Sequence, residues 1–401
     1  MCLHSTLTEI CHHGRAGEVD RRTPVFTQKV TMIDPKDPTK IRVAFIGTGA
    51  IANAHAHALQ QQPGVELIAA VDIDRSRAEA FAGKWGVTRT AASLAEAING
   101  GGLDLVAICT PPSSHLPLAL EALEHGLHAV IEKPPALSLS QMRKLESAEE
   151  VSAGSLSCVF QHRFGSGARR MLSLQESGVL GRPLVGTCNT LWFRDQAYFD
   201  VPWRGLWDVE GGGPTMGHGI HQFDLLLHLW GPWAEVTAFA GKLARRTDTE
   251  DASAAIVRFE SGAIATIINS VLSPRETSYM RLDFENATVE LEHLYGYADH
   301  NWTVTPAPGQ GAVVDLWTQG EDHESGHPAQ YRAIIRSLQG GEAAPVSISD
   351  AYATMELAAA IYASSVSGTT IARGQIDESS PFFTRMDGHL EPWKQEEELN
   401  A

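Results

Sequence analysis

A glycine-rich loop followed by an acidic residue is the first feature of the chain with ligand-binding chemistry. The loop Gly47-Thr-Gly-Ala-Ile-Ala52 follows the apolar run Ile41–Ile46 and precedes a helical pattern. Its glycines permit a tight turn and bring the backbone close to a pyrophosphate, which then faces free N–H groups at the helix start. Asp72 ends the next apolar run, where a carboxylate can accept hydrogen bonds from an adenosine ribose. This pattern predicts an NAD site, with NADP possible because Arg75 and Arg77 lie close by.

Two further segments follow later apolar runs. Thr110-Pro111-Pro112-Ser113-Ser114-His115 comes after the run 105–109, and Glu132-Lys133-Pro134 comes after the run 129–131. In open α/β sheets, ligands bind at the carboxyl ends of the strands. Lys133 is therefore expected where a substrate meets the cofactor. Taken alone, a lysine in a proline-rich turn is more often solvated.

The apolar pattern predicts the elements that position these groups. Four apolar runs in the first half alternate with helical patterns, at 41–46, 65–71, 105–109 and 129–131. This alternation predicts βαβ units and a parallel sheet. The second half holds apolar or alternating runs, many separated by turn residues, at 184–193, 233–240, 254–259, 263–270 and 281–284. They predict an antiparallel sheet, followed by helices at about 328–338 and 350–367.

Composition excludes several classes of protein. With 31 Lys+Arg against 48 Asp+Glu, the 401 residues carry a formal net charge of −17. This charge argues against nucleic acid or an anionic membrane surface as a partner, because both attract clustered basic residues. No apolar run approaches the roughly 18 residues of a membrane span. Five scattered cysteines do not form a disulfide framework, so we expect a cytoplasmic location.

Four segments follow from these patterns. Residues 1–40 are expected to form a tail or an arm on a partner subunit, with a linker at Asp34-Pro-Lys-Asp-Pro38. The Cys11-His12-His13 trio in this tail lacks a second pair of ligands, which argues against a metal site. We expect a dinucleotide-binding domain over 41–160, a substrate-binding and oligomerisation domain over 161–373, and a polar extension over 374–401. A late helix of the second domain is expected to pack back on the first.

Over about residues 41–373, the sequence resembles the Gfo/Idh/MocA family of nicotinamide-dependent oxidoreductases. The resemblance rests on the glycine loop, Asp72, the 110–115 segment, Glu132-Lys-Pro134, Gln161-His-Arg163-Phe, Gly211-Gly-Gly213 and Gly219-Ile-His221-Gln-Phe-Asp224. Glu-Lys-Pro followed by His-x-x-Asp is the specific part, since many folds share the glycine loop. The resemblance implies an α/β fold with an N-terminal Rossmann domain and a C-terminal α/β domain that has a large open, mostly antiparallel sheet. It also implies homodimers or homotetramers packed through that sheet.

The resemblance further implies hydride transfer between NAD(P) and a secondary alcohol of a sugar, cyclitol or related polyol. His221 is the expected acid/base, because an imidazole changes charge near neutral pH, and Lys133 is expected to hydrogen-bond the reacting oxygen. Without the resemblance, a core or helix-capping role for His221 would be the more common one. The residues expected to contact the cofactor are Gly47, Thr48, Gly49, Ala50, Ile51, Asp72, Thr110, Pro111, His115, Glu132 and Lys133.

The expected substrate contacts are Arg163, Trp192, His218, Asp224 and His327. Trp192 belongs to a tryptophan-rich stretch, whose rings could stack on a sugar but more often form core. Asp224 could orient His221 or bind a substrate hydroxyl. Alternatively, its negative charge could simply stabilise the N-terminus of its helix through the helix dipole. His218, His221, Asp224 and His228 form a conceivable metal-ligand set, yet nothing in their spacing requires an ion, so no metal is predicted.

One position departs from the family. Many members carry an aspartate four residues before the catalytic histidine, where this chain has Gly217. This puts the substrate class and the tuning of the base in doubt. Two alternatives to a dehydrogenase stay open: a glycoside-cleaving enzyme that oxidises its sugar transiently and recycles NAD, and a non-catalytic binding module. The presence of both Lys133 and His221 argues against the second.

Overall fold

A computed structural model describes residues 40–390, 392 and 393 of the chain. The Cys11-His12-His13 trio, the linker at 34–38 and the acidic run that begins at Lys394 lie outside these residues. Among the described helices, none is both long and apolar enough to cross a membrane.

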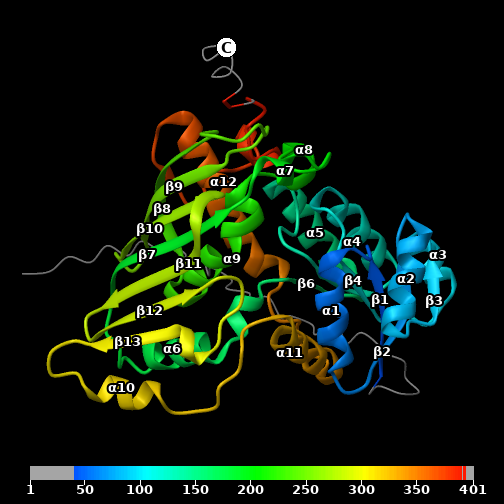
Figure 1. The fold of residues 1–401 in the computed structure, drawn as a ribbon, viewed down its shortest axis with the longest axis horizontal. Coiled ribbons are helices and arrows are strands. Elements are labelled where there is room, and N and C mark those ends of the chain that lie inside the picture. Colours follow the sequence, from blue (N-terminus) through cyan, green and yellow to red (C-terminus); the bar gives the residue numbers. More distant parts are fainter. Residues whose placement is uncertain (1–39, 391, 394–401) are drawn as a thin grey trace, which may run out of the picture.

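The first half of the chain forms a six-stranded parallel sheet in the order β3-β2-β1-β4-β5-β6 (Figure 1). This is the strand order of a doubly wound dinucleotide-binding domain. Its strands are β1 (Ile41–Ile46), β2 (Val65–Val71), β3 (Arg89–Ala91), β4 (Leu105–Ile108), β5 (His128–Ile131) and β6 (Leu156–Cys158). β1, β4 and β5 are almost wholly buried, which is why they appear as continuous apolar runs.

Helices connect these strands, and local sequence sets several of their ends. They are α1 (Ala50–Gln60), α2 (Arg75–Trp85), α3 (Leu94–Asn99), η1 (Pro112–Ser114), α4 (His115–Glu124) and α5 (Leu139–Val151). Asp74 caps the start of α2 by accepting from the Ser76 N–H, and Gly86 ends it in the left-handed conformation. The sequence analysis did not predict β3 or α3, because neither is long enough to show a clear period.

The second half forms an eight-stranded sheet in the order β13-β12-β11-β7-β10-β9-β8-β14. Its strands are β7 (Pro183–Phe193), β8 (Trp233–Gly241), β9 (Ala252–Phe259), β10 (Ile264–Ser270), β11 (Leu272–Phe284), β12 (Ala287–His293), β13 (Trp302–Pro306) and β14 (Ile371–Ala372). β7 and β10 pair in parallel, and the other neighbouring pairs are antiparallel. The predicted fold class, a Rossmann domain joined to a mostly antiparallel sheet, is confirmed.

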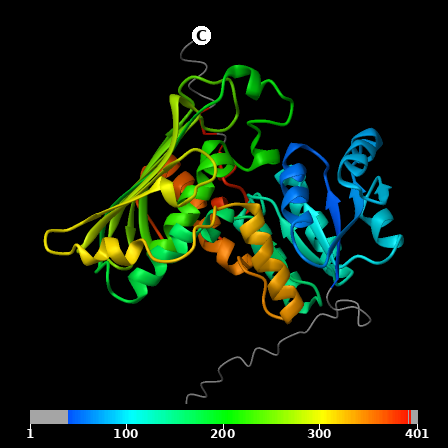
Figure 2. The same cartoon turned by 60° about the horizontal axis from the view of Figure 1, so that its bottom comes forward.

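Helices cover one side of the large sheet, as Figure 2 shows. They and the remaining short helices are η2 (Gln161–Phe164), α6 (Ser166–Glu176), α7 (Gln196–Phe199), α8 (Trp207–Glu210), η3 (Thr215–Gly219), α9 (Ile220–Trp230), η4 (Asp299–Asn301), α10 (Ala312–Trp317), α11 (His327–Gly340), α12 (Ile348–Ser367) and α13 (Pro381–Thr384). The leucine-rich α9 is almost entirely buried and packs against β7, and α12 lies between β8 and α5. These two helices therefore join the sheet to the first domain.

Helix α11 packs against α1 of the dinucleotide-binding domain, although about 270 residues separate the two in sequence. Its buried face forms one core cluster with β1, β4 and α1, through Tyr331, Ile334, Ile335 and Leu338. This contact brings the start of α11 to the carboxyl end of the parallel sheet.

Candidate active site

The glycine loop has the geometry of a phosphate cradle. Gly47 has φ of +82°, and a Cβ there would lie 2.8 Å from the Thr110 Cγ2 and 3.0 Å from the Cys109 carbonyl oxygen. At Gly49, by contrast, a Cβ would meet nothing within 4 Å, so the space beside this backbone is open. Gly49 also starts α1 without a side-chain cap, which leaves the N–H groups of its first turn available to an anion. The predicted loop from Gly47 to Ile51 therefore fits a pyrophosphate.

Asp72 lies at the end of β2, beside that loop. Its Oδ2 accepts from the Thr48 backbone N–H at 2.9 Å and from the Thr48 hydroxyl at 2.8 Å, and its Oδ1 accepts from the Asp74 N–H. Burial favours a raised pKa for Asp72, but these hydrogen bonds outweigh burial and lower the pKa. The carboxylate is therefore ionised at neutral pH and fits the ribose-binding role.

The Thr110–His115 segment forms a rigid turn after β4. Ser114 donates to the Thr110 hydroxyl oxygen at 2.7 Å. The fully buried His115 places Nδ1 2.9 Å from the Pro134 carbonyl oxygen and Nε2 2.8 Å from that of Thr110. Carbonyl oxygens only accept, so a neutral imidazole donates to one of them at a time. His115 thus links the turn after β4 to the turn after β5.

Lys133 follows β5 and precedes a cis peptide bond to Pro134. Its Nζ donates to the carbonyl oxygen of Gly217 at 2.7 Å. Burial lowers the pKa of Lys133, while the charges of Glu132 and Glu210 oppose that shift. The ammonium group is therefore held beside the segment that leads into α9.

His221 lies in the first turn of α9 and is buried, at 3% exposure. Neither of its ring nitrogens has a hydrogen-bond partner among the described residues. Its ring lies 5.1 Å from that of His162 and 5.9 Å from that of Tyr295, between centroids. Burial, followed by the charge of Lys133, holds the pKa of His221 well below its ordinary value. The imidazole is therefore neutral, and the lone pair of one ring nitrogen is available to accept a proton or a hydrogen bond from a bound alcohol.

Aromatic and polar side chains lie next to this pair. The ring of His218 is 5.2 Å from that of Trp192 and 6.1 Å from that of Tyr198. Trp192 is largely buried and donates from Nε1 to the Ser278 hydroxyl at 3.1 Å. A small cavity reaches Gly217 and His218 and is also lined by Tyr198. These rings can stack on the C–H face of a sugar.

Arg163 and Asp224 form a buried ion pair. The two guanidinium contacts, from Nε and Nη2, reach the two carboxylate oxygens at 2.8 and 2.6 Å. The Thr354 hydroxyl donates to Asp224 as well, at 2.8 Å. Asp224 is fully buried, so the pair connects η2, α9 and α12. A substrate contact for either residue stays a prediction.

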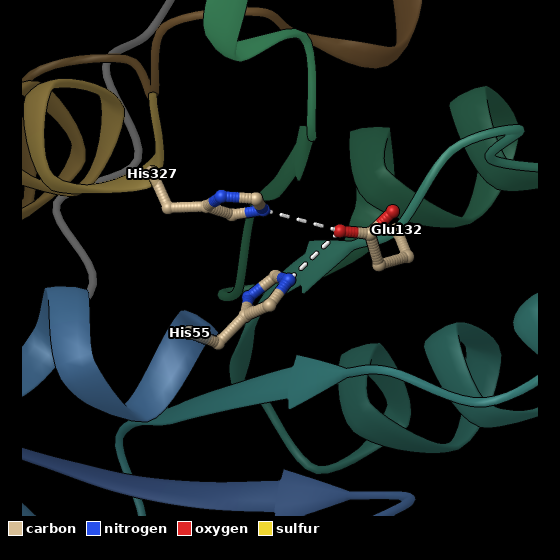
Figure 3. A group of neighbouring side chains, drawn as sticks. All are labelled: His55, Glu132 and His327. Carbon is tan, nitrogen blue, oxygen red and sulfur yellow. Dashed lines mark hydrogen bonds and ion pairs between the residues drawn. The ribbon is translucent and has the colours of Figure 1, made fainter. Parts of the chain in front are cut away.

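Glu132 and His327 meet in a buried cluster with His55 (Figure 3). His55 lies on α1, Glu132 follows β5, and His327 begins α11. The carboxylate of Glu132 therefore contacts two histidines within the protein, and a direct contact of Glu132 or His327 with the ligands stays a prediction.

Sequence reasoning did not select His55, His162 or Tyr295 as site residues. His162 lies inside the Gln161–Phe164 segment that carries the family resemblance, so that segment contained a signal for it. Tyr295 follows a late strand and has no local signature; its carbonyl oxygen accepts from His162 Nε2 at 2.6 Å. Only the packing of η2 against α9 reveals this group.

Comparison with known proteins agrees with this arrangement. Residues 41–158 match a family described as an oxidoreductase family with an NAD-binding Rossmann fold. Residues 168–290 match the C-terminal domain of the same Gfo/Idh/MocA group. The chain belongs to the Gfo/Idh/MocA family. It is therefore an oxidoreductase that uses NAD, and the glycine loop and Asp72 have the geometry to hold this cofactor.

Several family members are similar over most of their length. D-glucoside 3-dehydrogenase of Escherichia coli (strain K12) is 28% identical over 357 residues, which cover 82% of this chain and 97% of that protein. The scyllo-inositol 2-dehydrogenase (NAD(+)) of Bacillus subtilis (strain 168) is 27% identical over 245 residues, 59% of this chain and 68% of that protein. Among solved structures, the WlbA dehydrogenase of Bordetella pertussis, in complex with NADH and UDP-GlcNAcA, has a TM-score of 0.75 at 28% identity. The aligned residues cover 83% of this chain and 98% of the chain in that structure.

Proposed function

We propose that this protein transfers a hydride between NAD and a secondary alcohol of a sugar, cyclitol or related polyol, with Lys133 and His221 as the catalytic pair. The observation that carries the proposal is a geometric one: Lys133 Nζ binds the Gly217 carbonyl oxygen, one helical turn before the buried imidazole of His221, which has no hydrogen-bond partner among the described residues. Lys133 follows β5 at the carboxyl end of the parallel sheet, the edge that also carries the glycine loop and where a nicotinamide is expected.

In the oxidation direction, His221 accepts the hydroxyl proton of the substrate. The buried ring is neutral, so the lone pair of one ring nitrogen can take that proton. The ammonium group of Lys133 donates a hydrogen bond to the same oxygen and stabilises the negative charge that develops there. NAD, when bound, accepts the hydride. In the reduction direction, His221 returns the proton to the oxygen.

The relatives and the side chains around His221 support a ring-shaped polyol as substrate. One relative is named for a glucoside and another for an inositol, both rings rich in secondary hydroxyls. Trp192, Tyr198 and Tyr295 provide aromatic surface, and Arg204 stacks on the Tyr198 ring at 4.0 Å. His218 supplies a polar edge suited to hydroxyl groups.

The test is an NAD-reduction assay across sugars, cyclitols and glycosides. We expect Lys133→Met and His221→Asn to lower turnover about 10²-fold or more while NADH binding persists. Lys144→Met, on the exposed surface of α5, and His125→Asn, at an exposed residue just after α4, serve as matched controls. Normal turnover by both site variants would overturn the assignment. Net accumulation of NADH distinguishes a dehydrogenase from an enzyme that oxidises its sugar only transiently.

We also propose that the protein forms a homodimer or homotetramer through the face of the large sheet turned away from α9 and α12. Large apolar side chains alternate onto that face, and Phe239, Ile256 and Val185 are 78%, 58% and 57% exposed. A monomer seldom leaves such a patch in water. Light scattering should give a multiple of the 43.4 kDa chain mass. Phe239→Asp with Ile256→Asp should shift the mass toward the monomer, and an unchanged mass would refute this interface.

A further inference from the structure

Two buried histidines converge on one carboxylate oxygen of Glu132 (Figure 3). The Nε2 of His55 lies 2.8 Å from the Glu132 Oε1, and the Nε2 of His327 lies 3.4 Å from the same oxygen. The exposed fractions of the three residues are 0%, 6% and 6% for His55, Glu132 and His327. The second oxygen of Glu132 accepts from the backbone N–H of Lys133 at 3.0 Å.

Hydrogen bonds alone can account for the contacts among these three side chains, without a metal ion. If His55 donates from Nε2 to Glu132, its Nδ1 is free to accept from the Tyr331 hydroxyl, which lies 2.7 Å away. His327 likewise donates from Nε2. The separation of 2.8 Å between His55 Nε2 and Glu132 Oε1 is a hydrogen-bond length. Two ligands of a tetrahedral zinc ion, each about 2.0 Å from the metal, would lie ~3.3 Å apart. The geometry therefore favours a hydrogen-bonded carboxylate over a metal centre.

The network connects the elements that build the site. His55 lies on the helix that starts at the glycine loop, and Glu132 immediately precedes Lys133. His327 and Tyr331 come from the first turns of α11. Each partner of Glu132 thus fixes a different element against the end of β5. Burial would raise the pKa of Glu132, but the hydrogen bonds from His327 and His55 outweigh burial and hold the pKa well below its ordinary value.

We propose that His55, Glu132 and His327 form a buried carboxylate clamp that positions Lys133 at the end of β5 for hydride transfer. This inference rests on the proposed role of Lys133. The three residues act through Lys133 and are positioning residues. Glu132 exerts two effects: its Oε2 fixes the backbone of Lys133, and its negative charge stabilises the ammonium group.

The decisive variants are Glu132→Gln and the pair His327→Leu and His327→Gln, with His125→Gln as an exposed control. We expect Glu132→Gln to keep NADH affinity within about threefold and to lower turnover about tenfold or more, because a misplaced catalytic group costs rate rather than binding. Loss of the Glu132 charge should also lower the pKa of Lys133, so the matching limb of the pH–kcat profile should move to lower pH. His327→Gln retains an N–H donor and should recover much of the turnover lost in His327→Leu.

The other outcomes overturn the clamp. The clamp is refuted if the Glu132 and His327 variants have the same turnover and pH profile as His125→Gln. It is also refuted if neither Glu132→Gln nor His327→Gln folds, because the cluster would then act only on stability. Stoichiometric Zn²⁺ binding by the wild-type chain in equilibrium dialysis, lost in Glu132→Gln, would replace the clamp with a metal site. The Lys133→Met variant keeps the two proposals apart. If it turns over normally, the proposed function fails; if it is impaired while the clamp variants are normal, only the clamp fails.

Discussion

The Nζ of Lys133 lies 2.7 Å from the carbonyl oxygen of Gly217, one helical turn before His221. Gly217 stands at the position where many members of the family carry an aspartate, and it meets the ammonium group through its backbone carbonyl. A Cβ built at Gly217 would meet nothing within 4 Å, so the site has room for a side chain. A carboxylate introduced at position 217 would therefore add a negative charge close to Lys133.

Gly217→Asp tests this difference directly. A carboxylate within about 4–6 Å of a cation raises the pKa of that cation by about 1 or more. We therefore expect the limb of the pH–kcat profile that reports Lys133 or His221 to move to higher pH. Gly217→Asn has nearly the same shape without the charge, so its profile should stay at the wild-type position. Identical profiles for the two variants would contradict the prediction.

Asp72→Ser should relax the preference for NAD. The ionised carboxylate of Asp72 repels a 2′-phosphate, and like charges placed against each other cost several kcal/mol. We expect the ratio of kcat/KM with NADP to that with NAD to rise about 10²-fold. Glu79→Ser, on the exposed surface of α2, is the control. An unchanged ratio would mean that Asp72 does not face the ribose.

Glu250 should make stability fall as pH rises. Burial raises the pKa of this carboxyl from 4.5 to about 7, although the Gly213 and Thr215 N–H groups and the Tyr362 hydroxyl donate to it. Because the folded state holds the proton more tightly, the favourable contribution is complete below pH 4.5 and is lost as pH rises through about 7. The loss is about 3 kcal/mol.

Urea unfolding at pH 4.5 and pH 8 measures this contribution. The stability of the wild type relative to Glu250→Gln should fall by about 3 kcal/mol between the two pH values. Glu324→Gln, an exposed acid, should show no such change. A wild-type advantage that stays constant with pH would contradict the raised pKa.

Breaking the Arg163–Asp224 pair should be costly, because the remaining charge would stay buried. Asp224→Ala should lower the free energy of unfolding by about 3–5 kcal/mol. The double variant Arg163→Met/Asp224→Leu removes both charges and should cost less than the single one. For comparison, Glu146→Ala breaks an exposed pair with Arg143 and should cost about 1 kcal/mol or less. Equal losses for the single and double variants would argue against an uncompensated charge.

Local sequence was sufficient to predict those elements whose conformation depends on residues close to one another in the chain. The glycine loop, the buried strands β1, β2, β4 and β5, and the late helices α11 and α12 all have a clear period or a clear end signal. The parallel pairing of β7 with β10 was not predicted, because strand order depends on partners far apart in sequence. The short β3 and α3 were missed for lack of any period.

The sequence by itself determined which strand ends carry chemistry, since the carboxyl edge of a parallel sheet follows from the order of its strands and loops. It thereby pointed to Lys133, Asp72 and the glycine loop. Only the tertiary structure decided that Glu132 meets His55 and His327, 77 and 195 residues away, and that His162 lies against His221. These contacts form when α11 packs on α1 and η2 packs on α9. Helix packing depends on the shapes of distant surfaces, and no local spacing of residues encodes it.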